Sequence, residues 1–158
     1  MAEIVPDYRV LADILAAARA AGRTIALTNG CFDLLHVGHV RLIQAAAREA
    51  DLLVVALNSD ESIQSNKGPG RPLVPLAERM EVIAALAGVH YVTSFGETTA
   101  DPLLLALRPD VHCKGTDWTA DRVPERATVR SYGGRIAIVG DPKTHSSTDL
   151  ARRLAERD

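Results

Sequence analysis

Short apolar runs alternate with segments of helical periodicity along most of the chain, and this alternation constrains the fold more than any other feature. The apolar runs predict five strands, at 24–29, 51–60, 89–95, 110–115 and 134–140. Helical spacing predicts helices over 8–21, 38–50, 75–88, 99–107 and 121–132, with a last helix after Ser147 or Thr148. This order is typical of an α/β fold, a doubly wound, mostly parallel five-stranded sheet of Rossmann-like layout.

The chain shows no linker and no internal repeat, so we expect residues 1–158 to form a single domain. Within it, residues 1–22 should form an N-terminal helix, 23–150 the core, and 147–158 a C-terminal helix. Residues 60–74 combine polar side chains with two glycines and two prolines, which predicts a mobile loop.

Composition narrows the partners and the compartment. Lys plus Arg (18) and Asp plus Glu (20) give a net charge of −2, which argues against nucleic acid or an anionic membrane as the main partner. No apolar run reaches the roughly 18 residues of a membrane span, and no signal-peptide pattern is present. Cys31 and Cys113 lack the spacing of a zinc site, so we expect reduced thiols in a cytoplasmic protein.

The stretch TNGCFDLLHVGHVRLI, residues 28–43, carries the clearest functional pattern. It places His36 and His39 around Gly38, just after a predicted strand, where a helix should begin. A helix N-terminus attracts phosphate through unpaired N–H groups, and glycine lets an anion approach the backbone. Two imidazole N–H groups at this turn can stabilise charge on a phosphoryl group in transfer, although paired histidines can also simply cap a helix.

In its order of strand, turn and helix start, the stretch resembles the signature of the H-x-G-H nucleotidyltransferase superfamily, which is cytidylyltransferase-like. Four more segments follow the order of one branch, the adenylyltransferases of the bacterial ADP-heptose pathway: ALNSDES, KGPGRPLVPLAERMEVIAAL, PDVHCKGTDW and GGRIAIVGDPKTHSST. The resemblance covers about residues 24–150. It implies transfer of AMP from ATP to D-glycero-β-D-manno-heptose 1-phosphate, with Mg²⁺ on the phosphate oxygens and release of pyrophosphate.

The resemblance also implies roles for single residues. Catalysis falls to four basic side chains, those of His36, His39, Lys67 and Arg79. Nucleotide binding is assigned to Asn29, Gly30, Cys31, Phe32, Gly38, His39, Lys67, Arg79, Ser146, Ser147 and Thr148. Binding of the acceptor is assigned to Asp33, Lys114, Asp117 and Trp118. No metal ligand is assigned with certainty, although Asp33 could lie near a metal, because the triphosphate itself would hold most of the Mg²⁺ shell.

Several of these residues also have a plainly structural interpretation. Lys67 can be a solvated loop side chain, Arg79 can pair with a neighbouring carboxylate, and Trp118 can simply pack. The hydroxyl groups of residues 146–148 can cap the last helix without binding any ligand.

The chain departs from the cytidylyltransferase pattern at a few positions. Pro142 stands where an arginine is common, with Lys143 beside it. Asp149 replaces a second threonine, and Cys31 replaces a threonine or valine. These departures weigh against cytidine chemistry more than against a phosphate site.

Three alternatives stay open. They are a cytidylyltransferase for glycerol 3-phosphate or another polyol phosphate, an adenylyltransferase that acts on phosphopantetheine or a flavin, and a nucleotide-binding sensor without turnover. Class I aminoacyl-tRNA synthetases share H-x-G-H, but 158 residues leave no room for their other domains. The resemblance also implies a separate sugar kinase upstream and a homodimer.

Overall fold

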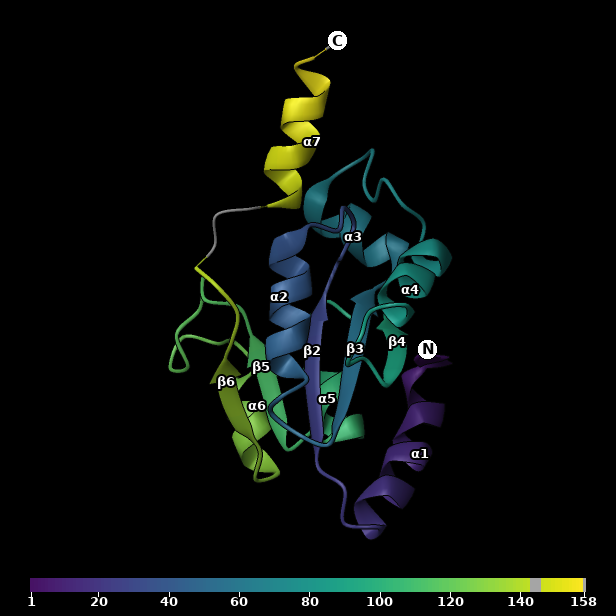
Figure 1. Cartoon of the computed structure of the whole chain (residues 1–158), viewed down its shortest axis with the longest axis vertical. Coiled ribbons are helices and arrows are strands. Elements are labelled where there is room, and N and C mark those ends of the chain that lie inside the picture. Colours follow the sequence, from purple (N-terminus) through teal and green to yellow (C-terminus); the bar gives the residue numbers. More distant parts are fainter. Residues whose placement is uncertain (143–145, 158) are drawn as a thin grey trace.

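The computed structural model describes residues 1–142 and 146–157. In this part of the chain six strands form one sheet, all paired in parallel, in the order β1-β4-β3-β2-β5-β6. The strands are β1 (Glu3–Asp7), β2 (Ile25–Gly30), β3 (Leu52–Asn58), β4 (Tyr91–Phe95), β5 (Val111–Lys114) and β6 (Arg135–Ile138). The doubly wound α/β fold is confirmed, and Figure 1 shows the strand arrows pointing to one common edge.

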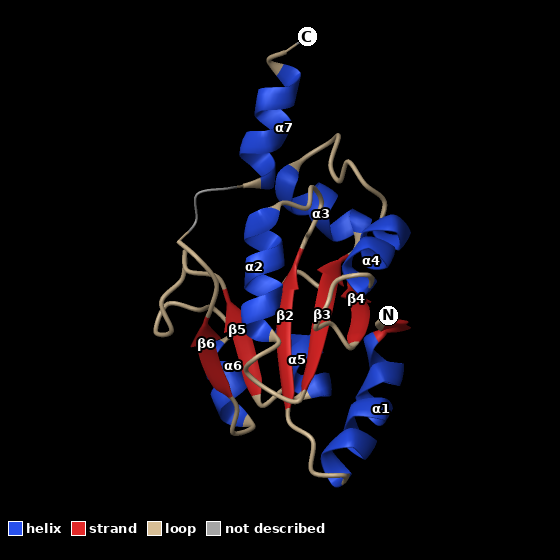
Figure 2. Ribbon diagram, viewed as in Figure 1, coloured by secondary structure: helices blue, strands red, loops and turns tan. Residues whose placement is uncertain are grey.

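Helices cover both faces of this sheet, as Figure 2 shows. They are α1 (Tyr8–Ala20), α2 (Val37–Ala46), α3 (Asp60–Lys67), α4 (Leu76–Ala84), α5 (Asp101–Leu107), α6 (Arg126–Ser131) and α7 (Ser147–Ala155). Alternate residues of β3 serve the two faces: Leu53 packs in the core beneath α2 and α4, and Val54 packs with α1, α5 and α6. This two-sided burial explains why the central strands are almost continuously apolar.

The prediction of five strands was wrong by one, because β1 was placed in the N-terminal helix segment. Only Val5 of β1 is buried, and Pro6 interrupts the strand pattern. Proline is tolerated in a strand at the edge of a sheet, where one side of the backbone needs no partner. β1 takes this edge position beside β4, and α1 begins only at Tyr8, with Asp7 as its N-cap.

The prediction of a loop over 60–74 was wrong for its first half, which forms α3. Ser59 caps this helix by accepting a hydrogen bond from the Ser62 N–H, and two acidic residues follow in the first turn. An N-cap of this kind and acidic side chains near the positive end both favour a helix. Gly68, at φ +90°, ends it, and residues 68–75 form the connection to α4.

The strand order creates a switch point between β2 and β5. From β2 the chain runs outward through β3 and β4, and then returns to the other side of β2 as β5 and β6. The residues Ala26 and Leu27 pair with Val111 and His112 across this boundary. In sheets of this kind, ligands bind in the crevice that opens at the carboxyl ends of the strands at the switch point.

Two expectations from composition can be compared with the described residues. No helix among them is long and apolar enough to cross a membrane. Cys31 and Cys113 are both free thiols, the first half-buried and the second buried, as predicted. Burial raises the pKa of the Cys113 thiol to about 12, so this residue stays protonated and packs as a small apolar side chain.

Candidate active site

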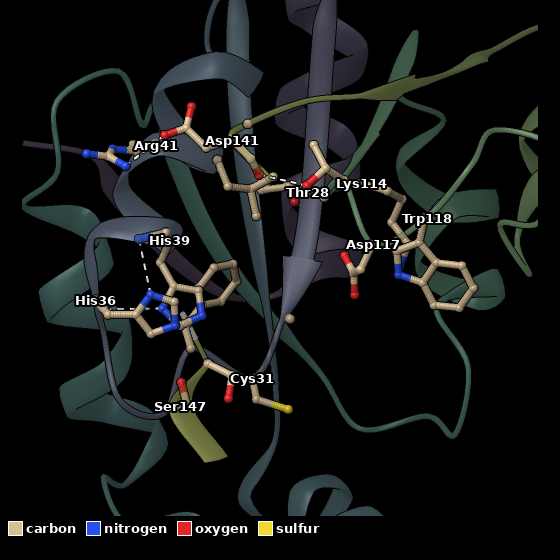
Figure 3. A pocket seen from close by; sticks show the side chains of 18 of the residues that line it. Thr28, Cys31, His36, His39, Arg41, Lys114, Asp117, Trp118, Asp141 and Ser147 are labelled. Atoms are coloured by element: carbon tan, nitrogen blue, oxygen red, sulfur yellow. Dashed lines mark hydrogen bonds and ion pairs between the residues drawn. The ribbon is translucent and has the colours of Figure 1, made fainter. Parts of the chain in front are cut away.

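A cavity of about 360 Å³ opens at the carboxyl edge of the sheet, at the switch point (Figure 3). Its wall is made by the end of β2 and the following turn, the first turn of α2, and the segments that follow β5 and β6. Lys67 at the end of α3 and residues 146–148 at the start of α7 complete it. Five separate stretches of the sequence therefore meet at one place.

Nearly all residues predicted for the site line this cavity. They are Asn29, Gly30, Cys31, Phe32, Asp33, His36, Gly38, His39, Lys67, Lys114, Asp117, Trp118, Ser146, Ser147 and Thr148. Arg79 does not line it. The structure thus brings together side chains that the sequence separates by more than a hundred positions.

The two motif histidines form the N-terminal cap of α2. His36 is the N-cap residue, and its Nδ1 accepts a hydrogen bond from the Gly38 N–H at 3.1 Å. His39 reaches back, and its Nδ1 accepts from the His36 N–H at 3.3 Å. The two rings stack with centroids 4.0 Å apart and planes 28° apart. The structural alternative, that these histidines cap the helix, is therefore confirmed.

This cap also fixes the chemistry of both rings. Because each Nδ1 accepts a backbone N–H, the proton of a neutral imidazole must sit on Nε2. Capping and donation to a ligand are thus compatible, since they use opposite nitrogens of the same ring. Figure 3 shows the two stacked rings together, close to Cys31 and Ser147.

The turn between β2 and α2 is shaped around Phe32. This residue adopts a left-handed backbone, with φ +50°, and buries its ring against His39 at a centroid distance of 5.3 Å. A Cβ at Gly30 would lie 3.2 Å from the Phe32 ring, so a larger residue there would disturb it. Backbone strain of this kind is typical of turns that carry a functional site.

Asp33 anchors the loop that follows α3. Its carboxylate accepts hydrogen bonds from Arg71 Nε at 2.9 Å and from the N–H groups of Leu73 and Val74 at 3.0 and 2.9 Å. Its side chain is fully buried. Burial alone would raise the pKa of this carboxyl, but the three donors outweigh it and hold the pKa below its ordinary value. Asp33 lines the cavity, but its oxygens serve the protein's own loop.

Arg79 lies outside the cavity and is completely enclosed, with 1% of its surface exposed. Its guanidinium donates to three backbone carbonyl oxygens, those of Cys31, Asn58 and Val74, at 2.7–3.0 Å. It also pairs with the Asp60 carboxylate at 2.6 Å. The structure thus gives Arg79 the expected carboxylate partner, but in the interior, where it braces the turn after β2 against the end of β3.

Lys114 lies at the end of β5, in the wall of the cavity. Its ammonium lies 3.8 Å from the Glu125 carboxylate and 5.5 Å from the centre of the Trp118 ring. Both partners of the ion pair are largely buried. Trp118 therefore does more than fill space: its ring face and the carboxylate together hold a positive charge at the wall of the cavity.

The start of α7 meets the cavity at its outer rim. Ser146 is the N-cap of α7 and accepts a hydrogen bond from the Asp149 N–H at 3.0 Å, as the capping interpretation predicted. Ser147 Oγ donates to the Leu34 carbonyl at 2.8 Å, which ties α7 to the turn before α2. Two helix N-termini, those of α2 and α7, therefore border the same cavity. Lys143 lies outside the described residues.

Sequence analysis missed an ion pair at the rim. Arg41, one turn into α2, pairs with the Asp141 carboxylate at 2.8 Å, and Thr116 Oγ1 donates to the Asp141 carbonyl. All three residues line the cavity. Arg41 follows His39 by two positions, but no spacing rule connects it to a residue a hundred positions away.

A second omission is His112 on β5, which is fully buried. Its Nε2 lies 2.9 Å from the Oδ1 of Asn29 on the adjacent strand β2. Burial, and then the charge of Lys114, lower the pKa of this imidazole from 6.5 to about 3. The signal in the sequence was a lone histidine in an otherwise apolar strand. Such a residue needs a polar partner when buried.

The donor set of the cavity gives little support to a metal held by the protein alone. No group of three or more His, Cys, Asp or Glu side chains among the described residues is arranged to hold a metal ion. The Asp33 carboxylate already accepts a hydrogen bond from Arg71, and the Asp141 carboxylate pairs with Arg41. A cavity of this kind suits a cation that enters already bound to phosphate oxygens.

Fold and site together define a nucleotidyltransferase-type α/β domain, with H-x-G-H at the helix that follows a central strand. A family model described as cytidylyltransferase-like matches residues 27–153. The chain belongs to this cytidylyltransferase-like family.

Curated relatives are close in sequence but longer. The chain is 46% identical to the bifunctional protein HldE of Syntrophotalea carbinolica over 147 residues, which is 93% of this chain and 30% of the relative. It is 47% identical to the bifunctional protein HldE of Geobacter sulfurreducens over 150 residues, 95% of this chain and 31% of the relative. The chain thus spans about 30% of the length of these relatives.

A solved structure supports the fold. The lipopolysaccharide core biosynthesis protein from Thermoplasma volcanium matches with a TM-score of 0.67 and 22% identity. The match covers 77% of this chain and all of the other.

Replacing Asp33 with asparagine should remove the anchor of the 71–74 loop. An amide NH₂ would face N–H donors in a buried place, and breaking a buried ion pair typically costs about 3–5 kcal/mol. Urea unfolding at pH 7 measures the loss, with Asp141→Asn, an exposed ion-pair partner, as a control that should lose less than about 1 kcal/mol. Because the folded pKa of Asp33 is depressed, the difference should shrink as the pH falls through that pKa. A loss as small as in the control would contradict the anchor.

His112 should make the fold sensitive to mild acid. The unfolded chain binds a proton on this residue below about pH 6.5, and the folded chain does not until about pH 3, so stability falls as the pH drops between these values. From pH 7 to pH 5 the wild type should lose about 2 kcal/mol that His112→Gln does not lose. Urea unfolding at both pH values gives the comparison, and parallel losses would show that His112 titrates normally in the folded chain.

Proposed function

We propose that the chain transfers AMP from MgATP to D-glycero-β-D-manno-heptose 1-phosphate and releases pyrophosphate. The observation that carries the reaction class is the stacked His36–His39 pair, whose Nδ1 atoms are held by the backbone at a cavity bordered by two helix N-termini. The heptose acceptor is supported by the motifs that follow the ADP-heptose branch and by the identity of about 46% to the bifunctional HldE proteins.

In this reaction an oxygen of the acceptor phosphate attacks the α-phosphorus of ATP. A new P–O bond forms, the bond between the α-phosphorus and the bridging oxygen to the β-phosphorus breaks, and pyrophosphate leaves with that oxygen. The acceptor phosphate is already anionic, so no side chain has to remove a proton. What the protein supplies is alignment of the two phosphates and stabilisation of the charge in the transition state.

The residues of the cavity can share this work. The Nε2–H groups of His36 and His39, with the first N–H groups of α2, would meet the oxygens that gain charge. Lys67 and residues 146–148 would hold the triphosphate, and Lys114 the acceptor phosphate. Mg²⁺ is part of the proposal as a component of the substrate MgATP, and no protein ligand is assigned to it. The upstream sugar kinase activity and the homodimer belong to the same proposal.

The first experiment is a substrate grid with pyrophosphate release as the readout. ATP and CTP are each combined, with Mg²⁺, with both anomers of heptose 1-phosphate and with glycerol 3-phosphate. We expect release only from ATP with the β-anomer. Release from CTP with glycerol 3-phosphate would instead make the chain a cytidylyltransferase for a polyol phosphate, which the family description favours as the second candidate. Nucleotide binding without release in any combination would favour the sensor.

His39 provides a test of the mechanism that separates its two roles. Asparagine at this position can still accept the His36 N–H through its side-chain oxygen but lacks a donor at the Nε2 position, whereas alanine removes both. Both variants should lose about 10²–10³-fold in turnover, the usual effect of losing one preorganised donor. Only His39→Ala should also lose the stability of a helix cap, about 1 kcal/mol. Turnover near wild type in His39→Asn would remove this ring from the mechanism.

A further inference from the structure

His112 and Asn29 form a polar pair inside an otherwise apolar part of the sheet. The residue Leu27 of β2 pairs with His112 of β5, so Asn29, two positions further along β2, lies on the same face of the sheet. The His112 ring is fully buried, whereas Asn29 is half-buried and lines the cavity. The pair therefore reaches from the protein interior to the wall of the site, with His112 at the inner end.

The chemical state of the pair follows from its contacts. A buried imidazole with a strongly lowered pKa is neutral and carries one N–H. Nε2 has a partner at 2.9 Å, and Nδ1 has none among the described residues. An orphaned buried N–H is rarer than an unused acceptor, so the proton belongs on Nε2, where it is donated to Asn29 Oδ1.

This hydrogen bond determines which way the Asn29 carboxamide faces. With Oδ1 bonded to His112, Nδ2 is the branch of the amide that remains for the cavity that Asn29 lines. Lys114, which lines the same cavity, stands two residues after His112 on β5. Asn29 of β2 and Lys114 of β5 thus contribute an amide and an ammonium to the lining of one cavity. A donor and a cation that line one cavity suit a phosphate group.

We propose that His112 is a positioning residue, which orients the Asn29 carboxamide so that its Nδ2–H group, together with Lys114, binds the phosphate of the acceptor substrate. This inference rests on the proposed function for the identity of the acceptor. It assigns the Asn29 side chain, and not only its backbone, to substrate binding. It also gives the buried histidine a reason to lie in an apolar strand: a neutral donor at this place fixes an amide that could otherwise face either way.

A double-mutant cycle tests the positioning role. Asn29→Ala and His112→Leu should each raise the KM for heptose 1-phosphate about tenfold, with the KM for ATP changed less than twofold. The double variant should be no worse than Asn29→Ala alone, because His112 acts only through that amide. His112→Gln, which can still donate to Oδ1, should stay within about threefold of wild type. A multiplied effect in the double variant, or equal losses in the leucine and glutamine variants, would overturn the proposal.

A control for the loss of a histidine hydrogen bond uses His90, an exposed residue that does not line the cavity and whose Nδ1 accepts the Leu53 N–H at 3.1 Å. His90→Leu also loses a hydrogen bond of a histidine and should leave both KM values within twofold. A rise in the acceptor KM of His90→Leu equal to that of His112→Leu would show that a general loss of structure explains the kinetics, and the proposal would fall.

A second readout does not depend on turnover. Inorganic phosphate is titrated into ¹⁵N-labelled full-length protein, and the side-chain amide signal of Asn29 is identified by its absence in Asn29→Ala. The signal should shift in the wild type and in His112→Gln, and shift much less in His112→Leu. If the wild type releases no pyrophosphate with heptose 1-phosphate but its Asn29 signal still shifts in this way, the proposed function fails and the positioning role stands. An Asn29 signal that does not respond to phosphate overturns the positioning role, whatever the activity.

Discussion

The buried guanidinium of Arg79 is the constraint on which the site depends. It does not line the cavity; it donates to the carbonyl oxygens of Cys31, Asn58 and Val74 and pairs with Asp60. These acceptors belong to the turn after β2, the end of β3, the connection before α4 and the start of α3. A charge enclosed in this way is stable only while its partners stay in place, because an uncompensated buried cation costs several kcal/mol. The Arg79 contacts therefore fix the turn that carries the motif. The Asp33 carboxylate also fixes the connection before α4, through the N–H groups of Leu73 and Val74.

Orientation by hydrogen bonds on the side away from the cavity recurs throughout the site. The His36 and His39 rings are each held at Nδ1 by a backbone N–H, so a neutral ring carries its proton on Nε2. The Asn29 amide is held at Oδ1 by His112. Lys114 is held between Glu125 and the Trp118 ring. For the two histidines and Asn29, a group of the protein holds one polar atom of the side chain and thereby fixes what the other polar atom can offer, whereas the partners of Lys114 contact the ammonium itself.

Sequence periodicity was sufficient for the layered α/β fold because the central strands are buried on both faces and the helices between them keep clear apolar stripes. It failed where stability comes from a few local contacts. The strand β1 depends on an edge position that tolerates Pro6, and α3 depends on the Ser59 cap more than on apolar spacing. Neither an edge position nor a single cap changes the apolar pattern of the chain.

The residues of the site also fall into those that the sequence could predict and those that it could not. Those in the H-x-G-H stretch and in KGTDW could be predicted because their motifs resemble those of a known family. Each motif also follows a recognisable strand, and carboxyl ends of parallel strands meet at one edge. Arg79 was predicted as a phosphate ligand, but only the packing of four segments around it reveals its buried partners. His112 and Glu125 were missed because their importance lies in contacts that no spacing within the sequence encodes. His112 contacts Asn29 on the neighbouring strand, and Glu125, at the start of α6, contacts Lys114.

The proposed reaction poses an electrostatic problem for the site. A chain of net charge −2 would have to accept two phosphorylated substrates at a cavity whose wall includes Asp33, Asp117 and Asp141. Asp33 and Asp141 are balanced by Arg71 and Arg41. In the proposed reaction, the attraction for phosphate then comes from Lys67 and Lys114 together with helix N-termini and oriented N–H groups, and these N–H groups are directional. A cluster of arginines would bind triphosphate, transition state and pyrophosphate almost equally, and uniform binding does not speed the chemical step. Donors held in fixed directions can favour the geometry of the reacting phosphorus over that of the bound substrates.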